Sequence, residues 1–247
     1  QLMFQPTITA FKALFDAGEL AVVNGCGYPP PNRSHFESMA IWQTASPEKK
    51  ETVGWLGPYI DHCLRGTESM MKAVNIGSEL PQAMVADSAP VPSIQSVEDF
   101  RFRLNGGPDA KREDDIIRAC NAVRNDSPAM EYLSRQATNA IIETDKIRSV
   151  ARGYKPDAAY PRGLGEELRT IAQLIHGNFG TRIFYCQTGG FDTLSGQLNS
   201  HGQTWQNVTQ SIAAFYQDLK AKGLQDKVVT MCFSEFGRRV QQNSSNG

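Results

Sequence analysis

The feature that most constrains this fold is a helix followed by a short apolar strand, a pattern that the second half of the chain shows twice. Residues 164–176 are amphipathic and lead into the apolar run 182–187. Residues 203–222, closed by Gly223, lead in the same way into the run 227–233. Short unbroken apolar strands are typical of parallel sheets covered on both faces, and the helices between them supply the crossover connections. The pattern therefore predicts an α/β fold with a mostly parallel sheet.

The first half of the chain continues this alternation. Residues 25–34 contain three prolines and two glycines, which exclude regular structure and predict a loop. Residues 112–152 are rich in helix formers with a break near Pro128, and they predict an antiparallel pair of helices. The other expected elements are helices over 7–17, 35–44 and 56–64 and strands over 20–24, 72–76 and 92–94.

Length and charge narrow the class of protein. At 247 residues with 40% hydrophobic residues, the chain suits one large core, so we expect a single domain over residues 1–247 with a helical insertion or subdomain at about 97–160. The net charge of −1 excludes a global field that would favour nucleic acid or an anionic membrane surface. No apolar run approaches the roughly 20 residues needed to cross a bilayer. The five cysteines lack metal-binding spacing, and Cys186 and Cys232 are expected to be buried thiols.

Three short polar clusters follow three of the expected strands, and their side chains are expected to converge at one edge of the sheet. The first cluster supplies Arg33, Ser34 and His35 as candidate catalytic residues. A serine at a helix start lies near unpaired N–H groups and the positive end of the dipole, which stabilise an alkoxide or bind a phosphate or sulfate. Arg33 would hold the same anion with two hydrogen bonds. Ser34 and Glu37 also form the Ser-x-x-Glu pattern of a capping box, which needs no function and is favoured by the local sequence.

The second and third clusters supply candidate metal ligands. Asp192 follows a strand and His201 lies further along, so together they offer an oxygen and a nitrogen ligand to one divalent ion. Each also has a structural interpretation, Asp192 as an Asx-turn residue and His201 as a polar residue near a helix start. Glu235 lies just beyond a buried strand, where a carboxylate needs a partner, either Arg238 or a metal.

Taken together, these segments resemble the bacterial domain-of-unknown-function family 1501, which is grouped with alkaline phosphatases, sulfatases and cofactor-independent phosphoglycerate mutases. The resemblance covers essentially the whole chain. It implies a three-layer α/β/α fold like that of alkaline phosphatase, whose carboxyl edge binds one or two divalent ions beside a serine or threonine nucleophile. Its carriers are residues 20–28, 32–36, 54–56, 189–193, Gln197, His201 and 234–239.

By position in the family pattern, Ser34 would be the nucleophile, and Asp192 and His201 would bind one metal. Glu235 would correspond to a metal-binding carboxylate of the sulfatases. The ion would be zinc, manganese, magnesium or calcium, and the hydroxyl would attack phosphorus or sulfur while the metal stabilises the developing charge.

The chain also departs from the family pattern. Leu194 stands where the family usually has histidine, and Phe236 stands where the sulfatases have one. The family's initial Gly-Gly-x-Asp-Gly segment and its later Thr-Asp-His-Gly segment do not occur in these residues. We therefore expect a fragment with an incomplete metal site and little metal-dependent turnover.

The leading expectation is a metal-dependent hydrolase of phosphate or sulfate esters, with a small anionic ester as substrate. The alternative is a non-catalytic binding or scaffold protein with a degenerate metal site, which Leu194 and Phe236 favour. A serine esterase is disfavoured because no Gly-x-Ser-x-Gly motif surrounds Ser34. Family members often carry twin-arginine export signals, so the resemblance implies a periplasmic or cell-envelope location. The sequence leaves the oligomeric state open.

Overall fold

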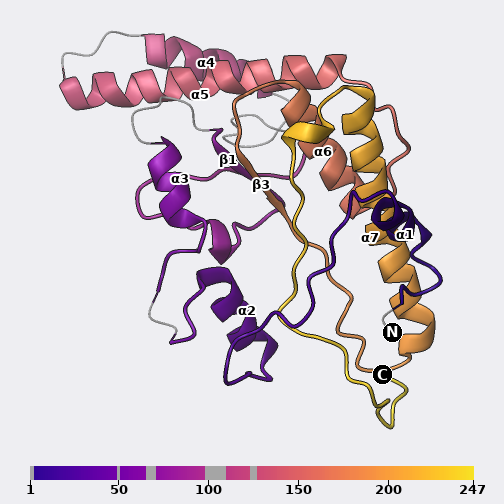
Figure 1. The fold of residues 1–247 in the computed structure, drawn as a ribbon. Helices are drawn as coiled ribbons and strands as arrows, with labels where there is room; N and C mark the ends of the chain where they lie inside the picture. The colour runs from indigo at the N-terminus through magenta and orange to yellow at the C-terminus, as the bar shows by residue number, and fades with distance from the viewer. Residues whose placement is uncertain (1–2, 49–50, 65–70, 98–109, 123–126) are drawn as a thin grey trace.

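The structure is a computed structural model that describes residues 3–48, 51–64, 71–97, 110–122 and 127–247 (Figure 1). In chain order its elements are α1 (Thr9–Asp16), α2 (His35–Thr44), α3 (Gly57–Leu64), β1 (Ala73–Ile76), η1 (Gln82–Met84), β2 (Ser93–Ile94), α4 (Ala110–Ala122), α5 (Pro128–Gly153), α6 (Leu164–His176), β3 (Ile183–Cys186), α7 (Gln197–Ala221) and η2 (Gln225–Lys227).

The strands of the described residues form one parallel sheet in the order β2-β1-β3. β1 pairs with β3 from Ala73 opposite Ile183 to Ile76 opposite Cys186, and with β2 from Asn75 opposite Ser93. β1 is buried along its whole length, as expected for a central strand between two neighbours. A parallel sheet combined with helices confirms the α/β prediction at this level.

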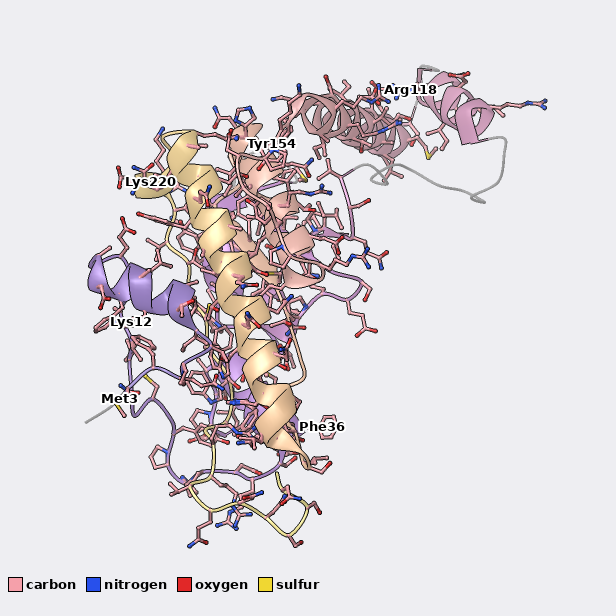
Figure 2. The ribbon with its side chains drawn as sticks, turned by 90° about the vertical axis from the view of Figure 1, so that its right-hand side faces the viewer. Met3, Lys12, Phe36, Arg118, Tyr154 and Lys220 are labelled. Atoms are coloured by element: carbon pink, nitrogen blue, oxygen red, sulfur yellow. The ribbon has the colours of Figure 1, made fainter. Side chains whose placement is uncertain are left out.

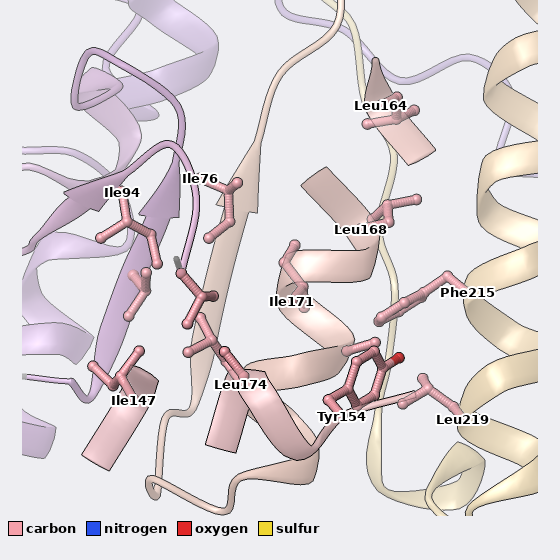
Figure 3. Close-up of a cluster of buried hydrophobic side chains, with 14 of the residues drawn as sticks. Ile76, Ile94, Ile147, Tyr154, Leu164, Leu168, Ile171, Leu174, Phe215 and Leu219 are labelled. Atoms are coloured by element: carbon pink, nitrogen blue, oxygen red, sulfur yellow. The ribbon is translucent and has the colours of Figure 1, made fainter. Parts of the chain in front are cut away.

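Helix α6 packs between the sheet and α7 (Figures 1 and 3). Its apolar residues Leu164, Leu168 and Ile171 recur at helical spacing and are buried, as is Leu174 in the following turn. Burial of each such side chain contributes about 2 kcal/mol relative to exposure. The helix begins where the Gly163 N–H donates to Glu166 Oε2 at 3.0 Å, a capping interaction that satisfies one backbone donor. This core therefore fixes how the sheet and α7 lie relative to each other.

The predicted helical pair is present as α4 and α5, which lie side by side and are joined by an ion pair between Arg118 and Asp145 at 2.7 Å. The C-terminal half of α5 belongs to the main core, because Ile147 and Ala151 are buried there against α6 and the sheet. The pair is therefore continuous with the core through α5. Parts of the predicted 97–160 insertion, residues 98–109 and 123–126, lie outside the described residues.

At the N-terminus, α1 lies beside α7 (Figures 1 and 2). The predicted helices over 7–17, 35–44 and 56–64 are confirmed as α1, α2 and α3, and the loop 25–34 is also confirmed. Gly54 lies where a Cβ would be 2.0 Å from the Gln82 carbonyl oxygen, so no side chain fits at this contact with η1. Within the described residues, no helix combines the length and apolar character that a membrane crossing requires.

Two strand predictions are wrong. Residues 20–24 and 228–233 have no regular structure, and Val23 and Val229 are 77% and 97% exposed. Strand formation requires a neighbouring strand, and an apolar run of residues does not show whether one is within reach. The predicted burial of Cys232 is wrong for the same reason, since it is exposed, while Cys186 on β3 is partly buried.

The buried carboxylate Asp218 anchors the segment that follows α5 to α7. Its side chain, with 0% exposure, accepts hydrogen bonds from the hydroxyls of Tyr154 and Tyr160, the Asp157 N–H at 2.9 Å and Lys222 Nζ at 2.9 Å. Burial raises the pKa of Asp218, but these hydrogen bonds outweigh burial and hold the pKa below its ordinary value. Asp218 is therefore ionised and fully paired in the folded protein.

We expect Asp218→Asn to destabilise the protein by about 3 kcal/mol, because it leaves Lys222 and the tyrosine hydroxyls with a poorer acceptor. Urea unfolding monitored by circular dichroism measures the loss. The contribution of Asp218 is present above its unfolded pKa of about 4 and disappears as the pH falls through the lowered folded pKa. Asp226→Asn, which changes an exposed aspartate of η2, is the control, and an equal loss in both variants would contradict this role.

Candidate active site

Two carboxylates from distant parts of the sequence contact the side chain of His35. Its Nδ1 donates to Glu235 Oε1 at 2.8 Å, and its Nε2 lies 3.5 Å from Asp192 Oδ2. We refer to His35, Asp192 and Glu235 as the His35 site. Each of the three predicted clusters supplies one of its members, so the clusters meet, although only one of them does so at the end of a strand.

The route to this convergence differs from the predicted one. Only the Asp192 cluster follows a strand in the described residues, where the turn after β3 includes Gly190 at φ 87°. His35 is instead fixed as the first residue of α2, and Glu235 lies in the extended segment after η2. That segment is held by Phe233, whose ring stacks on Trp42 of α2 at 6.0 Å and meets Tyr185 of β3 edge-on at 6.3 Å.

Glu235 is the most enclosed member of the site, with a side chain 11% exposed. Burial raises its pKa, but hydrogen bonds with His35, with its own backbone N–H and with Ser234 Oγ at 3.0 Å outweigh burial and lower the pKa below its ordinary value. Glu235 is therefore an ionised acceptor that fixes the orientation of the half-exposed His35 ring. On one side of that ring Phe236 packs edge-on at 4.8 Å between centroids.

Ser34 is the N-cap of α2. Its Oγ accepts from the Glu37 N–H at 3.4 Å, and its own N–H donates to Asn32 Oδ1 at 2.8 Å. The capping interpretation of Ser34 is therefore realised, and the positive end of the α2 dipole lies at this serine. Arg33 is exposed to solvent.

His201 lies inside α7 because the helix begins at Gln197, earlier than the predicted start at residue 203. Trp205 Nε1 donates to His201 Nε2 at 3.1 Å, and the rings of Phe191 and Trp205 lie edge-on 5.1 Å apart. Burial and the nearby charge of Arg238 lower the pKa of His201, which favours the neutral imidazole that accepts this bond. His201 thus belongs to an aromatic cluster formed with Phe191 and Trp205.

The predicted ligands Asp192, His201 and Glu235 do not fit one metal ion as they are arranged. The His35 ring lies between the two carboxylates and contacts each of them, and His201 Nε2 is engaged by Trp205. In the part of the chain that the structure describes, no three His, Cys, Asp or Glu side chains are grouped to hold a metal.

Sequence reasoning did not identify the aromatic cluster or the position of Arg238. The sequence predicts either Arg238 or a metal as the partner of Glu235. In the structure Arg238 instead donates to the Phe191 carbonyl oxygen and to Thr193 Oγ1 at 2.8 Å. The spacing of His201 and Trp205, four residues apart, is a signal for their contact once both are placed on one helix. Glu235, Phe236 and Arg238 line one end of an open cavity of about 2250 Å³ that extends along β3, α6 and α7.

Comparison with known proteins gives a family for the chain. The family described as "Protein of unknown function (DUF1501)" matches residues 22–247. No curated protein and no solved structure matches the chain. The matched range includes all three members of the His35 site. This chain belongs to family DUF1501.

Proposed function

We propose that this protein is a hydrolase of phosphate or sulfate esters that works at the His35 site. The observation that carries the proposal is the 2.8 Å hydrogen bond from His35 Nδ1 to the ionised Glu235, which orients the imidazole for proton transfer through Nε2, 3.5 Å from Asp192 Oδ2. We also propose that the parallel sheet belongs to a three-layer, alkaline-phosphatase-like fold, for which family membership is the support. A periplasmic or cell-envelope location is part of the same proposal.

In this mechanism Glu235 orients His35 and stabilises the positive charge that the ring acquires. Ser34, which precedes His35 at the N-terminus of α2, attacks phosphorus or sulfur through its hydroxyl oxygen. Its proton passes to His35, which returns the proton to the oxygen of the departing alcohol. Water then cleaves the Ser34 ester with His35 as base, releasing phosphate or sulfate and restoring the hydroxyl.

A divalent ion enters this proposal as a competitor of His35. Carboxylate oxygens suit magnesium, calcium and manganese, and imidazole nitrogen suits zinc, so the residue types are appropriate. An ion bound by Asp192 and Glu235 would have to displace the imidazole that contacts both carboxylates. Metal binding and the His35–Glu235 hydrogen bond are therefore expected to exclude each other.

The alternative function is a non-catalytic binding protein. Phe236 packs against His35 at a position that resemblance to the sulfatases would give to histidine, and Leu194 is exposed where the family pattern has histidine. Neither side chain can bind a metal. Under this alternative, anionic ligands bind but no ester is hydrolysed.

We expect His35→Ala to lower kcat/KM for an aryl phosphate or aryl sulfate ester by about 10²-fold or more, because the proton-transfer group is lost. The measurement is release of the phenol at neutral pH with and without added Zn²⁺, Mn²⁺, Mg²⁺ or Ca²⁺. His62→Ala, which changes an exposed histidine of α3, serves as the matched control. Absence of turnover in the unaltered protein, or equal activity in both variants, would rule the hydrolase out.

For the metal, we expect His35→Ala to bind Zn²⁺ more tightly than the unaltered protein, because Asp192 and Glu235 lose the imidazole that now pairs with them. Isothermal titration calorimetry measures the change. A weaker affinity in His35→Ala would mean that His35 is itself a ligand, in contradiction to the exclusion between metal binding and the His35–Glu235 bond.

A further inference from the structure

Arg238 carries a positive charge beside the His35 site that no acidic group of the described residues neutralises. Its guanidinium is held by two neutral oxygens, the Phe191 carbonyl and Thr193 Oγ1 at 2.8 Å. Within the described ranges, no carboxylate forms an ion pair with it. A guanidinium has five N–H donors, so most of them remain free for a ligand.

The ring of Phe236 contacts both this cation and His35. It lies 5.7 Å from Arg238 Cζ and meets His35 edge-on at 4.8 Å. The guanidinium faces an aromatic ring and neutral oxygens, and it forms no ion pair with Glu235 although the two residues are close in sequence. Arginine in such a setting matches the oxygen geometry of sulfate and phosphate groups.

The cavity next to Arg238 has an aromatic wall. Phe191, Trp205 and Phe236 line it together with Arg238, and beyond them it continues along apolar residues of α6 and α7. Phe191 and Trp205 are packed against the main core, so this wall is supported from behind. An aromatic wall directly beside the Arg238 cation suits a ligand with an apolar body and an anionic end.

We propose that Arg238 binds the anionic group of the ester and that the aromatic wall binds its alcohol portion. This inference rests on the proposed function and names its substrate class, which is singly charged esters of aryl or long-chain alcohols, such as aryl sulfates. A doubly charged phosphate monoester is disfavoured because Asp192 and Glu235 repel the second charge. Arg238, and not Arg33, is then the anion-binding residue.

The test is calorimetric titration with phenyl sulfate, phenyl phosphate and inorganic sulfate. We expect phenyl sulfate to bind most tightly, and Arg238→Gln to weaken it by about tenfold or more through loss of a charge-assisted hydrogen bond. Arg238→Lys keeps the charge but lacks the paired N–H donors of the guanidinium, so its affinity for phenyl sulfate should lie between those of the unaltered protein and Arg238→Gln. Arg239→Gln is the matched control, since it removes the neighbouring exposed arginine, and its affinity should stay within about twofold.

Circular dichroism of each variant confirms that it is folded. Equal losses in Arg238→Gln and Arg239→Gln, equal affinity for phenyl sulfate and inorganic sulfate, or no binding of phenyl sulfate overturns the inference. Binding that depends on Arg238 without any turnover supports the inference and rejects the hydrolase. Turnover that is unchanged in Arg238→Gln, with the same KM, supports the hydrolase and rejects the inference.

Discussion

The packing of α6 between the parallel sheet and α7 is the contact on which the rest of the described structure depends. Leu168, Ile171 and Leu174 are each at most 5% exposed and fill the space between β1, β3 and α7. Their burial fixes the position of β3 in the sheet, and so the point at which the chain leaves the sheet toward Asp192. It also sets the axis of α7, which carries His201 and Trp205. One buried helix therefore positions both Asp192 of the His35 site and the aromatic cluster that contains His201.

Phe236 has a distinct part in the electrostatics of the site. Its aromatic ring contacts both the imidazole of His35 and the guanidinium of Arg238. The ring thus borders an acidic part of the region, with Asp192 and Glu235 around an imidazole, and a cationic part with Arg238, and both parts reach the cavity. A histidine at this position would link the two parts through a polar ring.

Local signals in the sequence were sufficient for most helices and for three strands. Gly18, Gly223 and the Ser34 cap mark helix ends by backbone and side-chain chemistry that acts within a few residues. The runs at 20–24 and 227–233 have the composition of strands, but pairing depends on a neighbour distant in sequence, which composition does not reveal. The polar clusters were correctly expected to meet.

The partners within the site were harder to predict. His35 is hydrogen-bonded to Glu235, and Arg238 to Phe191 and Thr193. Such bonds depend on where irregular segments place side chains to within about an ångström or two. His201 was misplaced because the start of α7 was set six residues too late, which hid its position one turn before Trp205. Placing that start at Gln197 would have recovered the contact from helical geometry alone.

The hydrogen bond between His35 and Glu235 joins residues 200 positions apart. Closing so long a stretch of chain costs conformational entropy that a local contact does not. His35 lies at the end of a helix and Glu235 in an irregular segment, so we expect the site to open more readily than the α6 core. In a denaturant titration the site would therefore be dismantled at a lower concentration than the helical structure. Intact helicity in this protein is thus no guarantee of an assembled site.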